Sequence, residues 1–310
     1  MTATTTPTTA PERLGVGHQP KKRRSDLLPA LGYLAPGMSG FLLFIVVPLL
    51  ASLVISLYDW PLFGDVAFVG IQNYVDLFTH DPLFWQVLLN TILFATVYTV
   101  TNLVVCILIA RWLLSTGRFG TVVRVLMFIP VVTPMVANAM VWKLMLNGDG
   151  LINSLLGTVG IDPLPWLTDG KLAMASLIIM SLWQGIGYNI IVLTAGLNAI
   201  NPSLYEAAQI DGASALQRFI RITLPMLTPS IFFCTVMTVI GAFKVFTQPY
   251  TLTFGGPGTS TTTIVLYLYQ NGFSYDKLGY ASALAWVLFV LVMLITALQF
   301  SQQKRVTYDA

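Results

Sequence analysis

Long apolar stretches separated by polar loops dominate the pattern of this chain. Six of them are about 20 residues or longer, which is enough for a helix to cross the hydrocarbon core of a bilayer. They cover about 31–57, 85–110, 122–144, 172–199, 224–246 and 278–300. None of the six contains Asp or Glu. The pattern therefore predicts an all-α membrane protein with six transmembrane helices.

The composition agrees with this prediction. Hydrophobic residues make up 55% of the chain and charged residues 9%, whereas soluble domains carry about 25% charged residues. The net charge of +3 does not indicate nucleic-acid binding, because the basic residues form no stripe with interleaved aromatics. The run 21–24, Lys-Lys-Arg-Arg, fits contact with membrane lipid headgroups instead.

The positions of Lys and Arg predict the orientation, because basic residues near the ends of spans are held on the cytoplasmic side. With six spans, 12 of the 16 fall on one side: Arg13, Lys21, Lys22, Arg23, Arg24, Arg111, Arg118, Arg124, Arg218, Arg221, Lys304 and Arg305. We therefore expect both termini and the loop 200–225 in the cytoplasm. We expect a disordered tail over 1–25, a transmembrane domain over 26–303 and a short tail over 304–310.

Several kinds of chemistry have no residues to support them. The chain has no Gly-x-x-x-x-Gly-Lys-Ser/Thr phosphate loop, so any ATP hydrolysis would belong to a partner. His18 and His80 lack ligand-spaced partners, and Cys106 and Cys234 fall in different stretches; we expect no metal, no cofactor and no catalytic residues. Stretches without acidic residues disfavour a secondary transporter driven by protons or sodium. A membrane scaffold that transports nothing remains an alternative.

The polar loop 200–225 predicts a helix, a turn and a second helix. Asn201 is suited to cap a helix that starts with Pro202 and ends near Ile210. Gly212 permits a positive φ at the turn. A second short helix over about 213–221 would return the chain to the membrane at Leu224. A helical hairpin without special function is the alternative for any loop of this length.

This loop resembles the EAA motif of importer permeases of the ATP-binding-cassette (ABC) class. The matching positions are Glu206, Ala207, Ala208, Asp211, Gly212, Ile222, Leu224 and Pro225. The resemblance implies that the loop docks into a cleft on an ATPase subunit and transmits its motion to the membrane helices.

A second resemblance concerns the substrate class. The segments 68–74, 250–257 and 261–267 are similar to those of carbohydrate permeases. The resemblance covers about 31–300 and is closest to the first of two permeases in importers of the maltose-transporter and sn-glycerol-3-phosphate-transporter superfamily. It implies the type I ABC importer permease fold in a bacterial or archaeal plasma membrane. It also implies a second homologous permease, two ABC ATPase subunits that hold ATP and Mg²⁺, and an extracytoplasmic solute-binding protein.

Polar and aromatic groups in the last three stretches are the candidates for substrate contact. A sugar needs donors and acceptors for its hydroxyls and an aromatic wall for its ring faces. The candidates are Gln184, Tyr188, Asn189, Thr238, Phe243, Lys244, Phe246 and Gln248. Gln184 and Tyr188 are four residues apart and are expected on one helix face. Packing between helices is the alternative role for each.

Two further features leave alternatives open. Lys244 is either an interfacial lysine or an anion contact, and the latter would suit a permease for glycerol phosphate or a glycerophosphodiester. The pairs Pro130/Pro134 and Gly185/Gly187 either break their helices as gates or hinges or serve ordinary close packing.

Overall fold

The computed structural model describes residues 27–303; the predicted tails 1–25 and 304–310 lie outside them. Contacts divide the chain between Leu50 and Ala51 into two units. The first described helical run consists of α1 (Leu27–Phe41), the π-helical turn η1 (Leu42–Val46) and α2 (Val47–Ile55). This run is apolar over Gly32–Ile55 and long enough to cross a membrane, as the sequence predicts.

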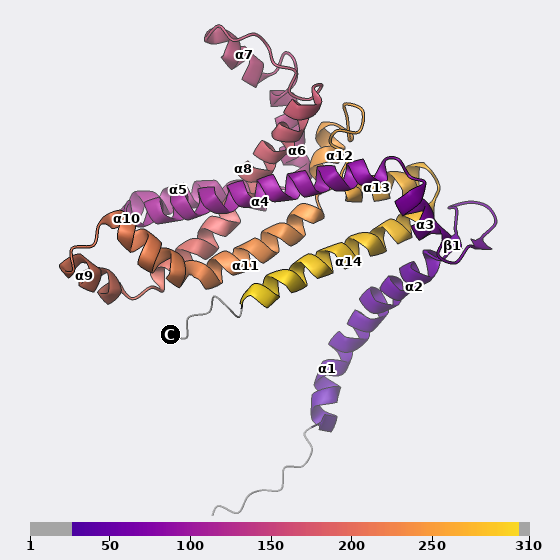
Figure 1. The fold of residues 1–310 in the computed structure, drawn as a ribbon, viewed down its shortest axis with the longest axis horizontal. Helices are drawn as coiled ribbons and strands as arrows, with labels where there is room; N and C mark the ends of the chain where they lie inside the picture. The colour runs from indigo at the N-terminus through magenta and orange to yellow at the C-terminus, as the bar shows by residue number, and fades with distance from the viewer. Residues whose placement is uncertain (1–26, 304–310) are drawn as a thin grey trace, which may run out of the picture. The chain divides into compact units, whose positions relative to one another are not determined.

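The second unit holds all the remaining elements (Figure 1). They are β1 (Tyr58–Asp59), β2 (Ala67–Phe68), α3 (Gln72–Thr79), α4 (Phe84–Leu114), α5 (Gly117–Val132), α6 (Met135–Met145), α7 (Leu151–Thr158), α8 (Gly170–Asn198), α9 (Pro202–Ile210), α10 (Ala215–Arg218), η2 (Phe219–Thr223), α11 (Leu224–Phe243), α12 (Thr247–Leu252), α13 (Ile264–Tyr269), η3 (Gln270–Ser274) and α14 (Leu278–Gln303). The two short strands pair antiparallel, with Tyr58 opposite Phe68.

Four helices of this unit are long and apolar enough to cross a membrane, and they are the predicted second, fourth, fifth and sixth stretches. They cover Phe84–Leu113, Gly170–Asn198, Ala215–Leu252 and Leu278–Gln302. Together with the first run, the described residues contain five such helices, or six if the bent pair α5 and α6 counts as one. The predicted all-α membrane class is confirmed.

The third predicted stretch, 122–144, is interrupted, because α5 and α6 are bent by 100°; of the two alternatives for Pro130/Pro134, a break is the one that the structure has. The break lies at Thr133, whose ψ of 137° is extended; a residue before proline is driven out of the helical region. Pro134 also has no N–H to donate to the carbonyl of Pro130. The Asn138 side-chain amide donates to that carbonyl instead, at 3.0 Å. The break is therefore at Pro134, while Pro130 lies inside α5.

Of the two alternatives for Gly185 and Gly187, a break does not occur, since α8 is continuous through both. A Cβ at Gly185 would lie 2.2 Å from the Tyr98 hydroxyl of α4, and one at Gly187 would lie 2.2 Å from the Met127 carbonyl oxygen of α5. A Cβ at Gly196 would lie 2.2 Å from Ser230 Oγ of α11. The glycines therefore let three neighbouring helices approach α8 closely, as small residues do in membrane bundles.

The helices α4, α8 and α11 pack against one another and enclose the core (Figure 1). One cluster of buried side chains includes Phe84, Phe94, Leu177, Met180 and Leu284. A second cluster includes Leu113, Ile190, Leu193 and Leu227, together with the free cysteines Cys106 and Cys234. The bundle holds a cavity that opens near the end of α11.

Candidate functional site

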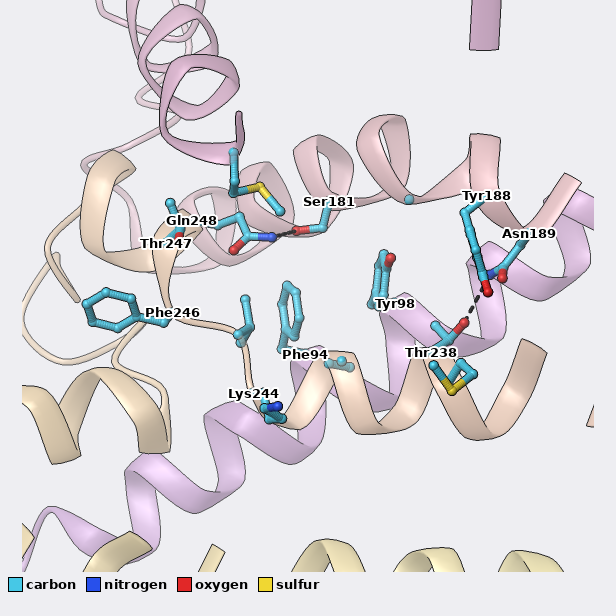
Figure 2. Close-up of a pocket in the computed structure, with 16 residues that line it drawn as sticks. Phe94, Tyr98, Ser181, Tyr188, Asn189, Thr238, Lys244, Phe246, Thr247 and Gln248 are labelled. Carbon is cyan, nitrogen blue, oxygen red and sulfur yellow. Dashed lines mark hydrogen bonds between the residues drawn. The ribbon is translucent and has the colours of Figure 1, made fainter. Parts of the chain in front are cut away.

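The cavity has a volume of about 460 Å³ and is bounded by α4, α6, α8, α11 and the start of α12 (Figure 2). This lies within the range of about 300–1,000 Å³ common for small-molecule sites. Its polar lining consists of Tyr98, Ser181, Tyr188, Asn189, Thr238, Lys244, Thr247 and Gln248. Lys244 is the one charged side chain among the lining residues. The cavity therefore offers many neutral hydrogen-bonding groups and no carboxylate.

The structure brings six of the eight predicted substrate residues to this cavity. They are Tyr188, Asn189, Thr238, Lys244, Phe246 and Gln248. Gln184 and Phe243 do not line it and are buried, with 8% and 6% of their surface exposed. Four residues along a helix of 3.6 residues per turn leave an offset of about 40°, which is enough to turn Gln184 away from the cavity that Tyr188 faces. Phe243 packs instead into the larger core cluster.

A buried hydrogen-bond network joins three helices at the cavity wall. The Asn189 amide donates to Asn102 Oδ1 of α4 at 2.6 Å. It also donates to Thr238 Oγ1 of α11 at 2.9 Å (Figure 2). Asn102 is fully buried and was absent from the predicted site. Both protons of the Asn189 amide are used, so its carbonyl oxygen is left as an acceptor. An amide inside the apolar stretch 85–110 was the signal that could have identified Asn102.

Aromatic residues missed by the sequence analysis form part of the cavity wall. Phe94 and Tyr98 of α4 stack with their ring centroids 5.6 Å apart and an interplanar angle of 13°. At the opposite edge, Phe246 stacks on Tyr250 with centroids 5.1 Å apart. Gln248 donates to Ser181 Oγ at 3.3 Å. Apolar ring faces and amide and hydroxyl groups therefore share one cavity.

The cavity edge at residues 244–246 is irregular backbone between α11 and α12. Such backbone at membrane depth requires internal partners, and the Thr263 hydroxyl donates to the Val245 carbonyl at 2.9 Å. The segment 250–263, which resembles carbohydrate permeases, is tied to itself by bonds such as Thr253 Oγ1 to Thr261 Oγ1 at 2.7 Å. It therefore supports the cavity edge without lining it.

The polar loop begins with the predicted helix start and turn. Asn201 Oδ1 accepts from the Ser203 N–H at 3.0 Å, and Pro202 is the first residue of α9. Gly212 has a φ of +75°. Both of these predictions are confirmed. The Arg218 guanidinium donates to Gln209 Oε1 at 3.2 Å, which ties α10 to α9.

The predicted second helix differs from the structure. Most of the predicted range 213–221 is helical, but the helix starts at Ala215 as α10 and continues through η2 into α11 without a break. In η2 the Leu224 N–H bonds to the Phe219 carbonyl, five residues back. We attribute the wide turn to Pro225, which has no N–H and whose ring crowds the preceding turn of a regular helix.

The coupling residues predicted from the motif lie on or next to this loop. Glu206 and Ala207 are exposed, Ala208 is half-buried, and Asp211 and Gly212 are exposed. Ile222, Leu224 and Pro225, which belong to η2 and α11, are half-buried. Ile210 is 87% exposed at the end of α9. A large apolar side chain exposed at the tip of a polar loop is suited to contact with another protein.

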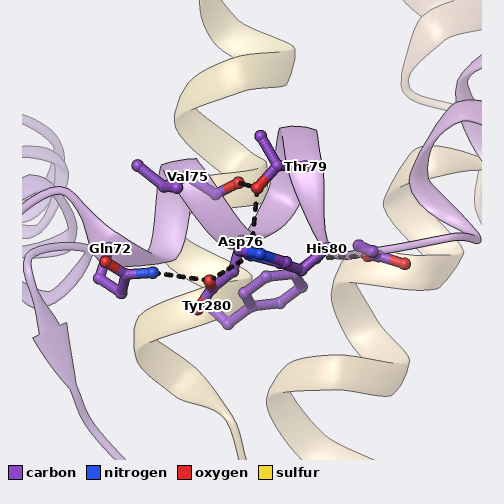
Figure 3. A network of polar contacts seen from close by, with 7 residues as sticks. Gln72, Val75, Asp76, Thr79, His80 and Tyr280 are labelled. Carbon is purple, nitrogen blue, oxygen red and sulfur yellow. Dashed lines mark hydrogen bonds and ion pairs between the residues drawn. The ribbon is translucent and has the colours of Figure 1, made fainter.

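A polar cluster at the other end of the bundle ties α3 to α4, α13 and α14. Asp81 Oδ1 accepts from the Leu83 and Phe84 N–H groups at the start of α4, and its Oδ2 accepts from the hydroxyls of Tyr267, at 2.8 Å, and Tyr280. Burial, with the Asp81 hydrogen bond as the second cause, raises the pKa of Tyr267. Asp76 accepts from Gln72 and contacts His80 (Figure 3).

This arrangement defines a multi-pass membrane transport protein. Several helices can cross a bilayer, they enclose a polar and aromatic cavity, and an exposed helical loop extends from their ends. The chain belongs to the family of binding-protein-dependent transport system inner membrane components, whose model matches residues 102–308. It is thus a permease subunit of an ABC importer and has no catalytic role of its own.

Proteins that are similar to this chain in sequence or structure agree with this assignment. The lactose transport system permease protein LacF of Rhizobium radiobacter is 36% identical over 86% of this chain and 91% of its own length. The sulfoquinovosyl glycerol transport system permease protein SmoG of Agrobacterium fabrum is 35% identical over 88% of this chain and 89% of its own. A solved bacterial alginate ABC transporter, in complex with a periplasmic protein that holds an alginate pentasaccharide, has a chain that matches with a TM-score of 0.81 and 25% identity. That match covers 92% of this chain and 96% of the other. The fold is that of a type I ABC importer permease.

Proposed function

We propose that this permease translocates a carbohydrate-class solute that an external binding protein delivers. The observation that carries the proposal is the cavity of Figure 2, in which the stacked rings of Phe94 and Tyr98 face neutral amide and hydroxyl groups. Such a combination suits a molecule with many hydroxyls and apolar ring faces. The names of LacF and SmoG, which refer to transport of a disaccharide and of a glycosyl glycerol, support the same class.

We further propose that separate ATPase subunits drive the transport through the loop of α9 and α10. Glu206, Asp211, Gly212 and the apolar Ile210 are exposed there, as a docking element requires. In this scheme two ATPase subunits bind ATP and Mg²⁺, a second homologous permease completes the membrane part, and both termini face the cytoplasm of a bacterium or archaeon. The residues 26–303 act as one permease domain, and 1–25 and 304–310 are its tails.

The docking proposal is tested with a pair of glycine variants in the co-purified transporter. Gly212 and Gly160 both have positive φ, +75° and +79°, and a Cβ at either would meet no atom within 4 Å. Gly212→Ala and Gly160→Ala therefore carry a similar backbone strain of about 1–2 kcal/mol, but only the first strains the proposed docking loop. We expect Gly212→Ala alone to lose ATPase subunits on purification. Equal retention of the ATPase by both variants would refute the docking role.

The cavity is tested with a pair of tyrosine variants. Tyr188 lines the cavity and its hydroxyl bonds to no other described residue, whereas Tyr275 lies outside the cavity and is 59% exposed. We expect Tyr188→Phe to raise the KM for uptake of a labelled disaccharide by about fivefold, the worth of about one hydrogen bond, and Tyr275→Phe to leave it unchanged. An unchanged KM in both variants would remove the Tyr188 hydroxyl from the site.

Lys244 favours a second candidate substrate, glycerol phosphate or a glycerophosphodiester. It is the single cation at the cavity, at the end of α11, and could bind a phosphate. Uptake of labelled glycerol 3-phosphate that is lost in Lys244→Met would support this candidate. Retained uptake of a neutral disaccharide by the same variant would favour the carbohydrate.

A further inference from the structure

A second, smaller cavity lies where the polar loop meets the ends of the membrane helices. Its volume is about 250 Å³, and its walls come from the ends of α4 and α8, from α9 and from α10 with η2. Its polar lining consists of Arg111, Arg218, Tyr205 and Thr223. It is separate from the cavity of Figure 2, with which it shares no lining residue.

The charge of this cavity is unbalanced within the described part of the chain. No acidic residue lines it. Among residues 27–303 the one ion pair is His80 with Asp76, so neither guanidinium is neutralised there. Arg218 donates to the neutral Gln209 amide, and Arg111 makes no hydrogen bond to a described residue. Two cations at one small cavity repel each other, and an anion between them removes that cost.

Arg111 has one evident structural role, because it lies in the last turn of α4, where a cation complements the helix dipole. Arg218 also lies in the last turn of a helix, α10, but α10 continues through η2 into α11, so no helix end is there for its charge to complement. The wall beside Arg218 is held in place by the hydroxyls of Tyr205 and Thr223, 3.0 Å apart, and by a bond from Thr223 to the Arg218 carbonyl. These bonds hold the backbone of Arg218 at the cavity wall.

The size and the position of the cavity indicate the ligand. A volume of 250 Å³ equals that of about eight water molecules at about 30 Å³ each, which leaves room for a phosphate group. The planar fork of a guanidinium matches phosphate oxygens. The cavity lies at the ends of two helices that can span a membrane, Phe84–Leu113 and Gly170–Asn198, the level at which lipid headgroups lie. Basic pockets between the ends of membrane helices are known to hold such headgroups.

We propose that this cavity binds a phosphate group between Arg111 and Arg218, supplied either by an anionic lipid headgroup or by soluble phosphate. The cavity walls belong partly to membrane helices and partly to the loop of α9 and α10. A bound phosphate therefore fastens the loop to the end of α4. The site exists whether or not that loop docks an ATPase, so it is independent of the proposed function.

The test uses the purified full-length chain in lipid nanodiscs. One set contains phosphatidylcholine alone and the other also contains phosphatidylglycerol. The double variant Arg111→Gln/Arg218→Gln is compared with Arg118→Gln/Arg221→Gln, which removes the same charge from two exposed arginines outside the cavity. Native mass spectrometry counts the phosphatidylglycerol that stays bound on release, and thermal unfolding is followed while inorganic phosphate replaces chloride at constant ionic strength.

We expect the cavity variant to lose about 30-fold in apparent affinity for the phosphate group, since each basic residue near an anionic headgroup contributes about fivefold. The control variant should retain wild-type affinity. Retention of phosphatidylglycerol without a response to inorganic phosphate identifies a lipid as the source, and the reverse identifies soluble phosphate. The charge-conserving Arg111→Lys/Arg218→Lys should keep part of the binding, which separates lost charge from misfolding. Equal binding by the cavity and control variants, or no binding by the wild type, overturns the proposal and leaves the two arginines to pair with a partner protein.

Discussion

Substitution of Gly187 by alanine should force apart two helices of the bundle. A Cβ at this position would lie 2.2 Å from the Met127 carbonyl oxygen, 2.9 Å from the Met127 carbonyl carbon and 3.0 Å from the Phe128 Cα. All three are backbone atoms of α5, so no side chain can rotate away. The helices α5 and α8 must separate locally by about 1 Å before the methyl group reaches ordinary contact distance.

The cost follows from two opposing effects. Overpacking of a close interface costs about 1–3 kcal/mol, while alanine is favoured over glycine in a helix interior by about 1 kcal/mol. Gly157 lies in α7, and a Cβ there would meet no atom within 4 Å. Gly157→Ala therefore shares the helical gain without the clash. We expect the two variants to differ by about 1–3 kcal/mol, or about 2–12 °C in Tm at the scale typical of chains of this size.

Thermal unfolding of both variants in the same detergent measures this difference directly. Scattering or tryptophan fluorescence can follow it without any knowledge of the substrate. A Gly187→Ala protein as stable as Gly157→Ala would show that α5 and α8 can separate without cost. The close packing assigned to the glycines of α8 would then be refuted.

Three further substitutions test polar groups outside the main cavity and behind it. Asp81→Asn should lower the Tm more than Asp65→Asn does, because charge-assisted hydrogen bonds of about 1.5–3 kcal/mol from two tyrosines are weakened only at Asp81. Asn153→Ala should expose the segment 147–166 to limited proteolysis, because its side chain bonds to Gly148, Leu164 and Trp166; unchanged cleavage would contradict this. Asn189→Leu should lower the Tm of the protein more than Asn102→Leu does in the same unfolding assay. The Asn102 side-chain N–H₂ already lacks a partner among the described residues, so its removal in Asn102→Leu relieves the cost of a buried unpaired group. The reverse order would contradict the network.

The features that sequence predicted well depend on local chemistry. The apolar stretches could be located because a charge inside the hydrocarbon region is costly, and the start of α9 could be predicted because Asn201 and Pro202 carry their preference in their own side chains. The turn at Gly212 could likewise be predicted, because glycine itself permits the positive φ. None of these features requires knowledge of a neighbouring helix.

The features that sequence missed depend on which side of a helix faces protein and which faces lipid. Lipid tails are as apolar as leucine, so hydrophobic periodicity does not mark the buried face as it does in a soluble helix. Gln184 and Tyr188 were grouped on one face from their spacing of four residues alone, although only Tyr188 lines the cavity. Asn102 was missed because Asn189, which donates to its side chain from α8, is 87 residues away in the chain. The sequence left open whether the third span is broken, because a proline can be accommodated within a helix, as Pro130 is, or can break it, as Pro134 does.

Three of the four glycines of α8, Gly185, Gly187 and Gly196, also limit how this protein can evolve. α8 is the most enclosed of the candidate spans, with 56% of its most apolar window buried against 22–33% for Phe84–Leu113, Ala215–Leu252 and Leu278–Gln302. At Gly185, Gly187 and Gly196 even one added methyl group would collide with a neighbouring helix. Mutations that adapt the cavity to a new solute are therefore expected on α4 and around the irregular segment 244–246 more than at these three positions of α8. A family of permeases built in this way can vary its cargo while one helix stays nearly fixed.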